Sequence, residues 1–453
     1  MNVNPNAITE GVIWKQLLIF FFPILLGTFF QQMYNTADAV VVGRFVGKEA
    51  LAAVGGSTGV LINLMVGFFV GLSAGATVII AQYYGAHNDR EVGLAVHTAI
   101  ALSLAGGAIL TLAGLIGAPY ALRAMGVPED TFDYAVTYMR IYFGGVIATL
   151  IYNIGSAILR AVGDSRRPLY FLIVCCLTNI VLDVLFVVGF GWGIVGVGVA
   201  TVVAQIVSAV LVILTLMRSQ TAFRLYPRQI RFSGDILRRI IAIGLPTGLQ
   251  SMTYSVSNMI IQQSVNTFGT DIVAAWAACG KIDGVYWMII NAFGVAITTF
   301  VGQNYGAGLY DRVRGSVRSC LLMASIATVI VSVSLYFACE PIYRLFTSDA
   351  VVIEKGVWVL RMLVPWYITY VCSEVLSGAL RGAGNSVKPM IMNGLGICAL
   401  RVLWVFLVVP HYNSMDAVVV SYPISWVLTS ILFIVYYLRC GVVKDRAAIK
   451  NKA

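Results

Sequence analysis

The sequence predicts an all-α polytopic membrane protein with 12 transmembrane helices in two six-helix lobes. Of its 453 residues, 59% are hydrophobic and only 11% are charged, whereas soluble domains carry about 25% charged residues. Mean hydropathy is +0.87. The apolar segments are long enough to span a bilayer, which takes about 20 residues per helix. Their continuous apolar character argues against a β-barrel, whose strands alternate.

The apolar segments follow one another with short polar loops between them. We place the 12 segments at 14–43, 50–83, 93–118, 132–159, 168–190, 193–217, 240–267, 272–302, 315–338, 355–380, 389–410 and 415–438. The first is too long for a cleavable signal and contains an acid, so we expect it to be retained.

The longest polar loop lies at the midpoint and carries six arginines. It divides the chain into an N-terminal six-helix lobe (1–217), a basic cytoplasmic linker (218–239), a C-terminal six-helix lobe (240–438) and a basic cytoplasmic tail (439–453).

The net charge of +10 comes from Lys and Arg residues whose distribution along the chain matches a membrane topology. Lys and Arg gather in alternate loops, which the positive-inside rule assigns to the cytoplasm. We therefore expect a multi-pass protein of the plasma (inner) membrane with both termini cytoplasmic, partnered by the lipid bilayer and not by nucleic acid. The eight cysteines form no C-x-x-C pair, and the three histidines lack metal-ligand spacing.

An internal repeat organises the chain. IAQYYGAHNDR at 80–90 matches VGQNYGAGLYDR at 301–312, and SAILRAVGDSRRP at 156–168 matches SGALRGAGNSVKP at 377–389, both with an offset of 221 residues. Each half has an even number of spans, so both halves enter the membrane from the same side. The repeats are therefore parallel, related by a pseudo-two-fold axis along the membrane normal.

These duplicated elements, in 12 spans with a basic central loop, resemble the multidrug and toxic compound extrusion (MATE) family over nearly the whole chain. The resemblance implies two lobes around a V-shaped central cavity. It also implies export of small organic cations, driven by inward flow of sodium ions or protons. On this basis we expect a monomer with no cofactor beyond Na⁺ or H⁺ as the coupling ion.

Polar side chains mark the spans of the amino-terminal half. Asp38 and Asp183 are the acids, and Asn179 shares a helix face with Asp183 at i, i+4 spacing. Asn153 and Thr201 supply further oxygen atoms. No Lys or Arg lies well inside these spans to neutralise the acids.

Oxygen-rich sites suit a small hard cation. They equally suit a proton, because burial and a neighbouring negative charge favour the protonated carboxyl group. The family resemblance implies a cation or proton site at acids of the first and fifth helices, which here gives a possible Na⁺ site at Asp38, Asn179 and Asp183. The alternative is that each acid caps a local polar group or faces a water-filled vestibule.

The carboxy-terminal half carries charges of both signs. Lys281, Asp283, Glu374 and Arg401 sum to zero. They predict either a structural network of mutual ion pairs or groups that face the substrate.

Aromatic and helix-bending residues complete the predicted site. Tyr254 and Tyr370 stand where some family members carry acids, which argues against a second sodium site. Tyr34 could stack on a flat cation. Pro23 and Gly27 predict a bend in the first helix. The family resemblance implies that this bend is linked to occupancy of the acid site, and a static kink is the alternative.

The sequence favours some functions over others. Coupled antiport is favoured by the parallel duplication and the unpaired acids. Flipping of a lipid-linked or polyprenyl-linked precursor is the alternative within the same superfamily. We do not expect an enzyme, because no H-E-x-x-H, G-x-S-x-G or P-loop motif occurs. A channel is disfavoured, since two lobes provide no ring of identical filter elements.

Overall fold

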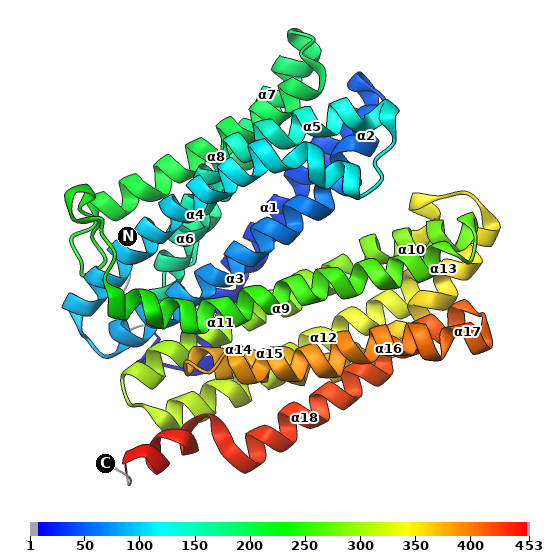
Figure 1. The fold of residues 1–453 in the computed structure, drawn as a ribbon. Helices are drawn as coiled ribbons and strands as arrows, with labels where there is room; N and C mark the ends of the chain where they lie inside the picture. Colours follow the sequence, from blue (N-terminus) through cyan, green and yellow to red (C-terminus); the bar gives the residue numbers. More distant parts are fainter. Residues whose placement is uncertain (1–7, 451–453) are drawn as a thin grey trace. The chain divides into compact units, whose positions relative to one another are not determined.

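The structure, a computed structural model, describes residues 8–450 (Figure 1). Residues 1–7, at the start of the predicted N-terminal lobe, and 451–453, at the end of the predicted tail, lie outside the described residues. Between residues 8 and 450 the backbone forms helices and no strand. The predicted all-α fold class is confirmed.

Eleven helical elements, if the short turn η3 of the linker is included, make up the amino-terminal half. They are α1 (Ile13–Val41), η1 (Val42–Val46), α2 (Lys48–Gly55), α3 (Ser57–Gly85), α4 (Asp89–Ala124), α5 (Glu129–Gly144), α6 (Val146–Ala161), α7 (Arg166–Asp183), η2 (Val184–Gly189), α8 (Gly193–Arg218) and η3 (Pro227–Gln229).

The carboxy-terminal half contains the remaining elements. They are α9 (Gly234–Asn266), α10 (Thr270–Ile282), α11 (Gly284–Gly306), α12 (Tyr310–Phe346), α13 (Ala350–Leu363), η4 (Val364–Trp366), α14 (Tyr367–Gly382), α15 (Val387–Asn393), η5 (Gly394–Ala399), α16 (Leu400–Leu407), α17 (Val409–Tyr412) and α18 (Met415–Lys450). Gly441 breaks α18, with φ +61°.

Every one of the predicted spans coincides with helix. Within residues 8–450, nine helices are long and apolar enough to cross a membrane, or ten if α5 and α6, bent by 49°, form one span. The predicted spans 240–267 and 355–380 are helical but are not among these helices. The first is rich in Ser, Thr and Gln, and the second is divided by η4 into α13 and α14, of 14 and 16 residues.

The helices pack into two compact units. The first contains Phe22–Ser251, and the second contains Ile8–Phe21 together with the chain from Met252 onward. The beginning of α1 therefore packs with the second half of the sequence, and the beginning of α9 packs with the first half. Both helices contain a proline close to the change of unit, Pro23 in α1 and Pro246 in α9.

Small residues allow α3 and α9 to cross at close range inside the first unit. A Cβ atom on Gly71 would lie 2.5 Å from the α-carbon of Gly248, and one on Gly75 would lie 2.3 Å from the Ile240 carbonyl oxygen. Such distances leave no room for a side chain. Close backbone approach through glycine is a common way of packing membrane helices.

The duplicated sequence motif has a structural role in each unit. In the first unit, Arg239, near the start of α9, donates from Nη1 to Tyr83 Oη at 2.6 Å. In the second unit, Arg312 of α12 donates to the carbonyl oxygens of Ile8 at 3.0 Å and Gly11 at 3.1 Å. Each copy of the motif thus anchors the segment that leads into α1 or α9.

The close crossing of α3 and α9 generates a prediction. Gly75→Val should lower the thermal stability of the purified protein, because overpacking a fitted site costs about 1–3 kcal/mol. Gly67→Val is the matched control on the same helix, since a Cβ there meets nothing within 4 Å. Melting curves in detergent measure both variants. Equal melting temperatures would contradict the packing described here.

Candidate functional site

Two acids of the first unit lie together in the protein interior. Asp38 belongs to α1 and Asp183 ends α7, and their exposed fractions are 5% and 0%. The two carboxyl groups are close enough to interact electrostatically. Packing of α7 against α8 removes Asp183 from solvent, so two carboxyl groups share one buried space.

The structure brings Asn179 and Thr201 next to the acids. Thr201 Oγ1 of α8 lies 3.4 Å from Asp38 Oδ2 and 3.0 Å from the Val197 carbonyl oxygen. The amide of Asn179, one turn before Asp183, adjoins Asp38. The i, i+4 spacing on α7 thus places an amide and a carboxyl group in the same site.

The polar atoms of this cluster are poorly satisfied by protein partners. Within the described part of the chain, Asp38 Oδ1, both carboxylate oxygens of Asp183 and both amide atoms of Asn179 make no hydrogen bond. No Lys or Arg there comes within the 4.0 Å ion-pair distance of either acid. Buried polar groups are normally bonded and buried charges are normally paired. A cation or a proton would supply the missing partner.

Tyr138 of α5 is a member of this cluster that sequence reasoning missed. It is buried, and its phenol lies near Asp38, Asp183 and Thr201. The sequence signal that could have found Tyr138 is the amphipathic pattern of α5, which places this residue on the buried face of the helix. A buried tyrosine normally needs a hydrogen-bond partner for its hydroxyl group. Tyr34 is also buried beside Asp38 and Tyr138, so its surroundings are polar as well as aromatic.

The remaining predicted residues of this half have more local contacts. Asn153 Nδ2 donates to the Thr149 carbonyl oxygen, one turn earlier on α6, at 2.9 Å. Pro23 lies inside α1. A Cβ on Gly27 would come within 3.2 Å of Leu172 Cδ1, so this glycine permits close packing of α1 and α7.

π-helical turns, which are wider than α-helical turns, lie close in sequence to the charged residues. The π-helical turn η2 follows Asp183 directly, and η1 begins four residues after Asp38. In the second unit, η5 ends two residues before Arg401. Such turns are rare and often occur at functional sites.

Glu374 of the second unit has protein partners of its own. Glu374 accepts from Arg381 Nη2 at 3.3 Å, and Tyr370 donates to it at 3.4 Å. Tyr254 lies close to both Tyr370 and Glu374. The predicted polar positions Tyr254, Tyr370 and Glu374 therefore meet in one group, completed by an arginine of the duplicated motif.

Of the two alternatives for the four charges, mutual ion pairing is not formed among the described residues. Asp283 accepts from Trp287 Nε1 at 3.1 Å and from Tyr367 Oη at 3.4 Å. Arg401 donates to Ser425, while Lys281 is exposed. Lys281 and Asp283 are two positions apart where α10 gives way to α11, so their side chains leave the backbone in different directions.

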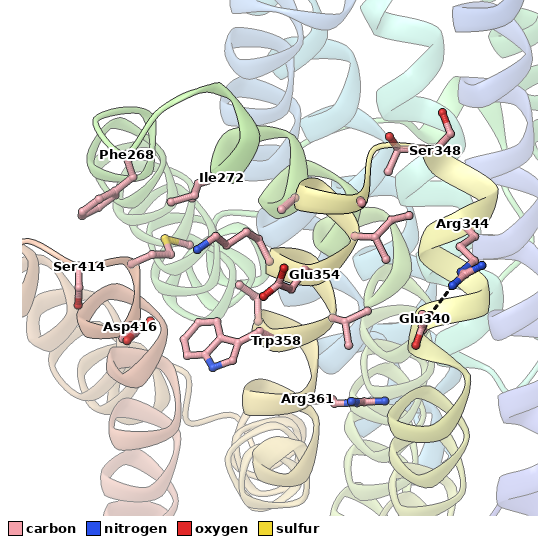
Figure 2. A pocket seen from close by; sticks show the side chains of 18 of the residues that line it. Phe268, Ile272, Glu340, Arg344, Ser348, Glu354, Trp358, Arg361, Ser414 and Asp416 are labelled. Atoms are coloured by element: carbon pink, nitrogen blue, oxygen red, sulfur yellow. Dashed lines mark hydrogen bonds and ion pairs between the residues drawn. The ribbon is translucent and has the colours of Figure 1, made fainter.

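A pocket of about 1230 Å³ opens in the second unit between α10, α12, α13 and α18 (Figure 2). Glu340 and Arg344, both on α12, form an ion pair of 2.7 Å at its edge. Trp358 and Asp416 also line it. Because the lining carries both signs of charge, the pocket has no marked preference for cations or anions.

Comparison with known proteins places the chain among transporters. A family model described as MatE matches residues 23–185 and 246–407, one match in each half. The chain is 26% identical over 438 residues to the "Probable multidrug resistance protein YoeA" of Bacillus subtilis, covering 94% of this chain and 93% of that protein. It is 23% identical to the "FAD transporter" of Shewanella oneidensis, covering 96% of each.

A solved structure shows the same fold. The structure described as "Crystal structure of MATE in the bent conformation" superposes with a TM-score of 0.91, covering 99% of this chain and 100% of that chain. Its sequence identity is 23%.

The unsatisfied acids generate a prediction about stability. Asp183→Asn should leave the melting temperature unchanged or raise it, because the variant removes one of two like charges that are buried without a basic partner. Asp164→Asn is the contrasting control. Asp164 is also buried, but it pairs with Arg167 at 3.2 Å and accepts from two backbone N–H groups.

The control should lose about 1 kcal/mol or more, since hydrogen bonds to charged groups contribute more than neutral ones. Melting curves of the two variants and the wild type, recorded in a buffer without sodium, measure the difference. A large loss of stability in Asp183→Asn would mean that this carboxylate has a protein partner.

Proposed function

The chain belongs to the MatE family of multidrug efflux transporters, and from that premise we propose that it is an antiporter. It exchanges an inward-moving cation, Na⁺ or H⁺, for an outgoing organic cation, by alternating access to a central cavity. Asp38 and Asp183 carry the coupling ion, with Asn179 and Thr201 as oxygen donors. We propose Asn153 as a further oxygen donor.

The observation that supports this proposal is the pair of buried acids without a basic partner. Ion pairs to Lys or Arg would hold such carboxyl groups in one charge state. Here the charge must be balanced by something that can leave. A bound Na⁺ would have carboxylate, amide and hydroxyl oxygens as ligands, the type that hard cations prefer. A proton would make one acid a donor to the other.

The coupling step uses α1. Asp38 lies on the same helix as Pro23, which frees a backbone carbonyl one turn earlier and so permits a bend. Binding or release of the ion at Asp38 changes the charge on that helix. We propose that the bend follows this change, with Gly27 leaving α1 free to move against α7.

The substrate proposal rests on family membership and on the second unit. Polar and aromatic groups meet there around Asp283, Tyr367 and Glu374, and aromatic faces attract flat cations. The relatives' names include multidrug resistance proteins and an FAD transporter, so substrate chemistry varies among them. Neither name points to a lipid-linked precursor, and we therefore favour drug export over flipping. We further propose a monomer with both termini in the cytoplasm.

The coupling role can be tested by export in cells. Asp38→Asn should reduce efflux of a fluorescent cation such as ethidium at least tenfold, because the amide cannot bind and release a proton or balance the charge of Na⁺. Asp271→Asn, an exposed acid in the first turn of α10, is the control and should export normally. Efflux by Asp38→Asn at the wild-type rate would refute the coupling proposal.

The coupling ion can be identified in proteoliposomes. Sodium and proton gradients are imposed separately, and ethidium movement is followed together with ²²Na⁺ uptake and internal pH. We expect one gradient to drive ethidium transport and the corresponding ion to move in the opposite direction. Both movements should be absent in Asp183→Asn. Ethidium transport at a rate that neither the sodium gradient nor the proton gradient changes would contradict antiport.

A further inference from the structure

Arg401 is a buried cation that the proposed antiport does not use. It lies on α16 within the apolar helical stretch Val387–Tyr412, and only 4% of it is exposed. Nε donates to Ser425 Oγ at 2.7 Å. The guanidinium carbon lies 4.0 Å from the ring centroid of Tyr422 and 5.5 Å from that of Trp426. These contacts hold the guanidinium plane in place without neutralising its charge.

No acid balances this charge. Within the described residues no carboxylate lies within the 4.0 Å ion-pair distance of Arg401, and Nη2 makes no hydrogen bond. Its titratable neighbours are the phenols of Tyr254, Tyr370 and Tyr422 and the thiol of Cys398, which are neutral at pH 7. The two acids predicted in the spans of this half are already engaged, Asp283 with Trp287 and Glu374 with Arg381.

An arginine cannot avoid this cost by losing its proton, because its pKa in water is too high. A buried and unpaired charge is strongly unfavourable. A ligand with an anionic group would remove the penalty. The guanidinium fork binds planar oxyanions through paired N–H groups, and here Nη2 is the group left without a partner.

The side chains around Arg401 also indicate the chemistry of the uncharged part of the ligand. Trp426 has ring contacts with Trp287 at 6.1 Å and Tyr370 at 6.3 Å between centroids, and Tyr422 has one with Trp276 at 5.6 Å. Arg401 is therefore set in a group of aromatic side chains. Such a group favours a flat, aromatic molecule next to the charged atom.

The internal repeat gives an independent argument. With the offset of 221 residues, Arg401 corresponds to Ile180, the residue after Asn179, and Tyr422 corresponds to Thr201. The helices that carry Asp183 and a hydroxyl in the first unit thus correspond to helices that carry a base and an aromatic ring in the second. On these equivalent helices the two halves carry charges of opposite sign.

We propose that Arg401, Ser425, Tyr422 and Trp426 bind the carboxylate or phosphate group of an aromatic organic anion or zwitterion. Nη2 donates to the oxyanion, and the ring of the ligand packs among the aromatic side chains. The inference rests on the proposed function in treating this ligand as cargo. It adds compounds that carry a negative group, with or without a positive one, to the organic cations already proposed as cargo.

Equilibrium binding to the purified protein tests this proposal without any transport step. The probes are 2-naphthoate and its methyl ester, measured by calorimetry in a neutral detergent. Wild type should bind the acid at least tenfold more tightly than the ester. Arg401→Gln should bind the two about equally, and Arg401→Lys should keep part of the preference. Arg361→Gln is the control, because Arg361 also lies over a ring, Tyr336 at 5.6 Å, but is exposed.

Equal binding of acid and ester by wild type would overturn the proposal, and so would an undiminished acid preference in Arg401→Gln. The wild-type comparison needs no variant, so a misfolded Arg401→Gln leaves the test decisive. A third arm adds phosphatidylglycerol to the micelles. Displacement of naphthoate by this lipid in wild type would identify a lipid headgroup as the occupant and overturn an aromatic cargo. Failure of Asp38-dependent export would leave all these results unchanged.

Discussion

Two carboxyl groups buried side by side, with no basic side chain in reach among the described residues, are the constraint on which the first unit depends. Protein atoms alone do not balance Asp38 and Asp183, and the neighbours that surround them are neutral: an amide, a hydroxyl and the phenol of Tyr138. Neutral dipoles orient toward charge but do not cancel it. We propose that a small exchangeable cation balances the cluster, and this links its geometry to the proposed antiport.

In the second unit, charged side chains are stabilised by contacts of other kinds. Glu374 has Arg381 as a close partner, whereas Asp283 is satisfied by an indole and a phenol. Arg401 is held by a hydroxyl and by aromatic faces. One sequence repeat has thus produced two sites with different electrostatics on similar backbones. We propose that the first half serves the coupling ion and the second half serves the cargo.

The scaffold that carries these sites uses few polar contacts and many small residues. Gly71 and Gly75 of α3 let the backbone of α9 come so close that no side chain would fit between the two helices at those points. The duplicated motifs add charge-assisted anchors through Arg239 and Arg312 at the entrances to α1 and α9. In lipid, close packing and such local hydrogen bonds must replace the hydrophobic driving force between helices.

The sequence by itself determined the fold class, the repeat and the family. These depend on apolar length, on loop charge and on spacing along the chain, which are local or strictly periodic quantities. It also identified Asp38, Asn179, Asp183 and Thr201, because a polar side chain in an apolar span stands out against its neighbours.

Only the tertiary structure decided which polar groups meet. It brought Tyr138 to the acids and gave Glu374 to Arg381, while Arg401 was left among aromatic rings. Net charge allowed a four-membered ion-pair network there as one of two alternatives. That network is not formed, because pairing depends on helix rotation and on packing between segments far apart in sequence, which charge counts do not contain.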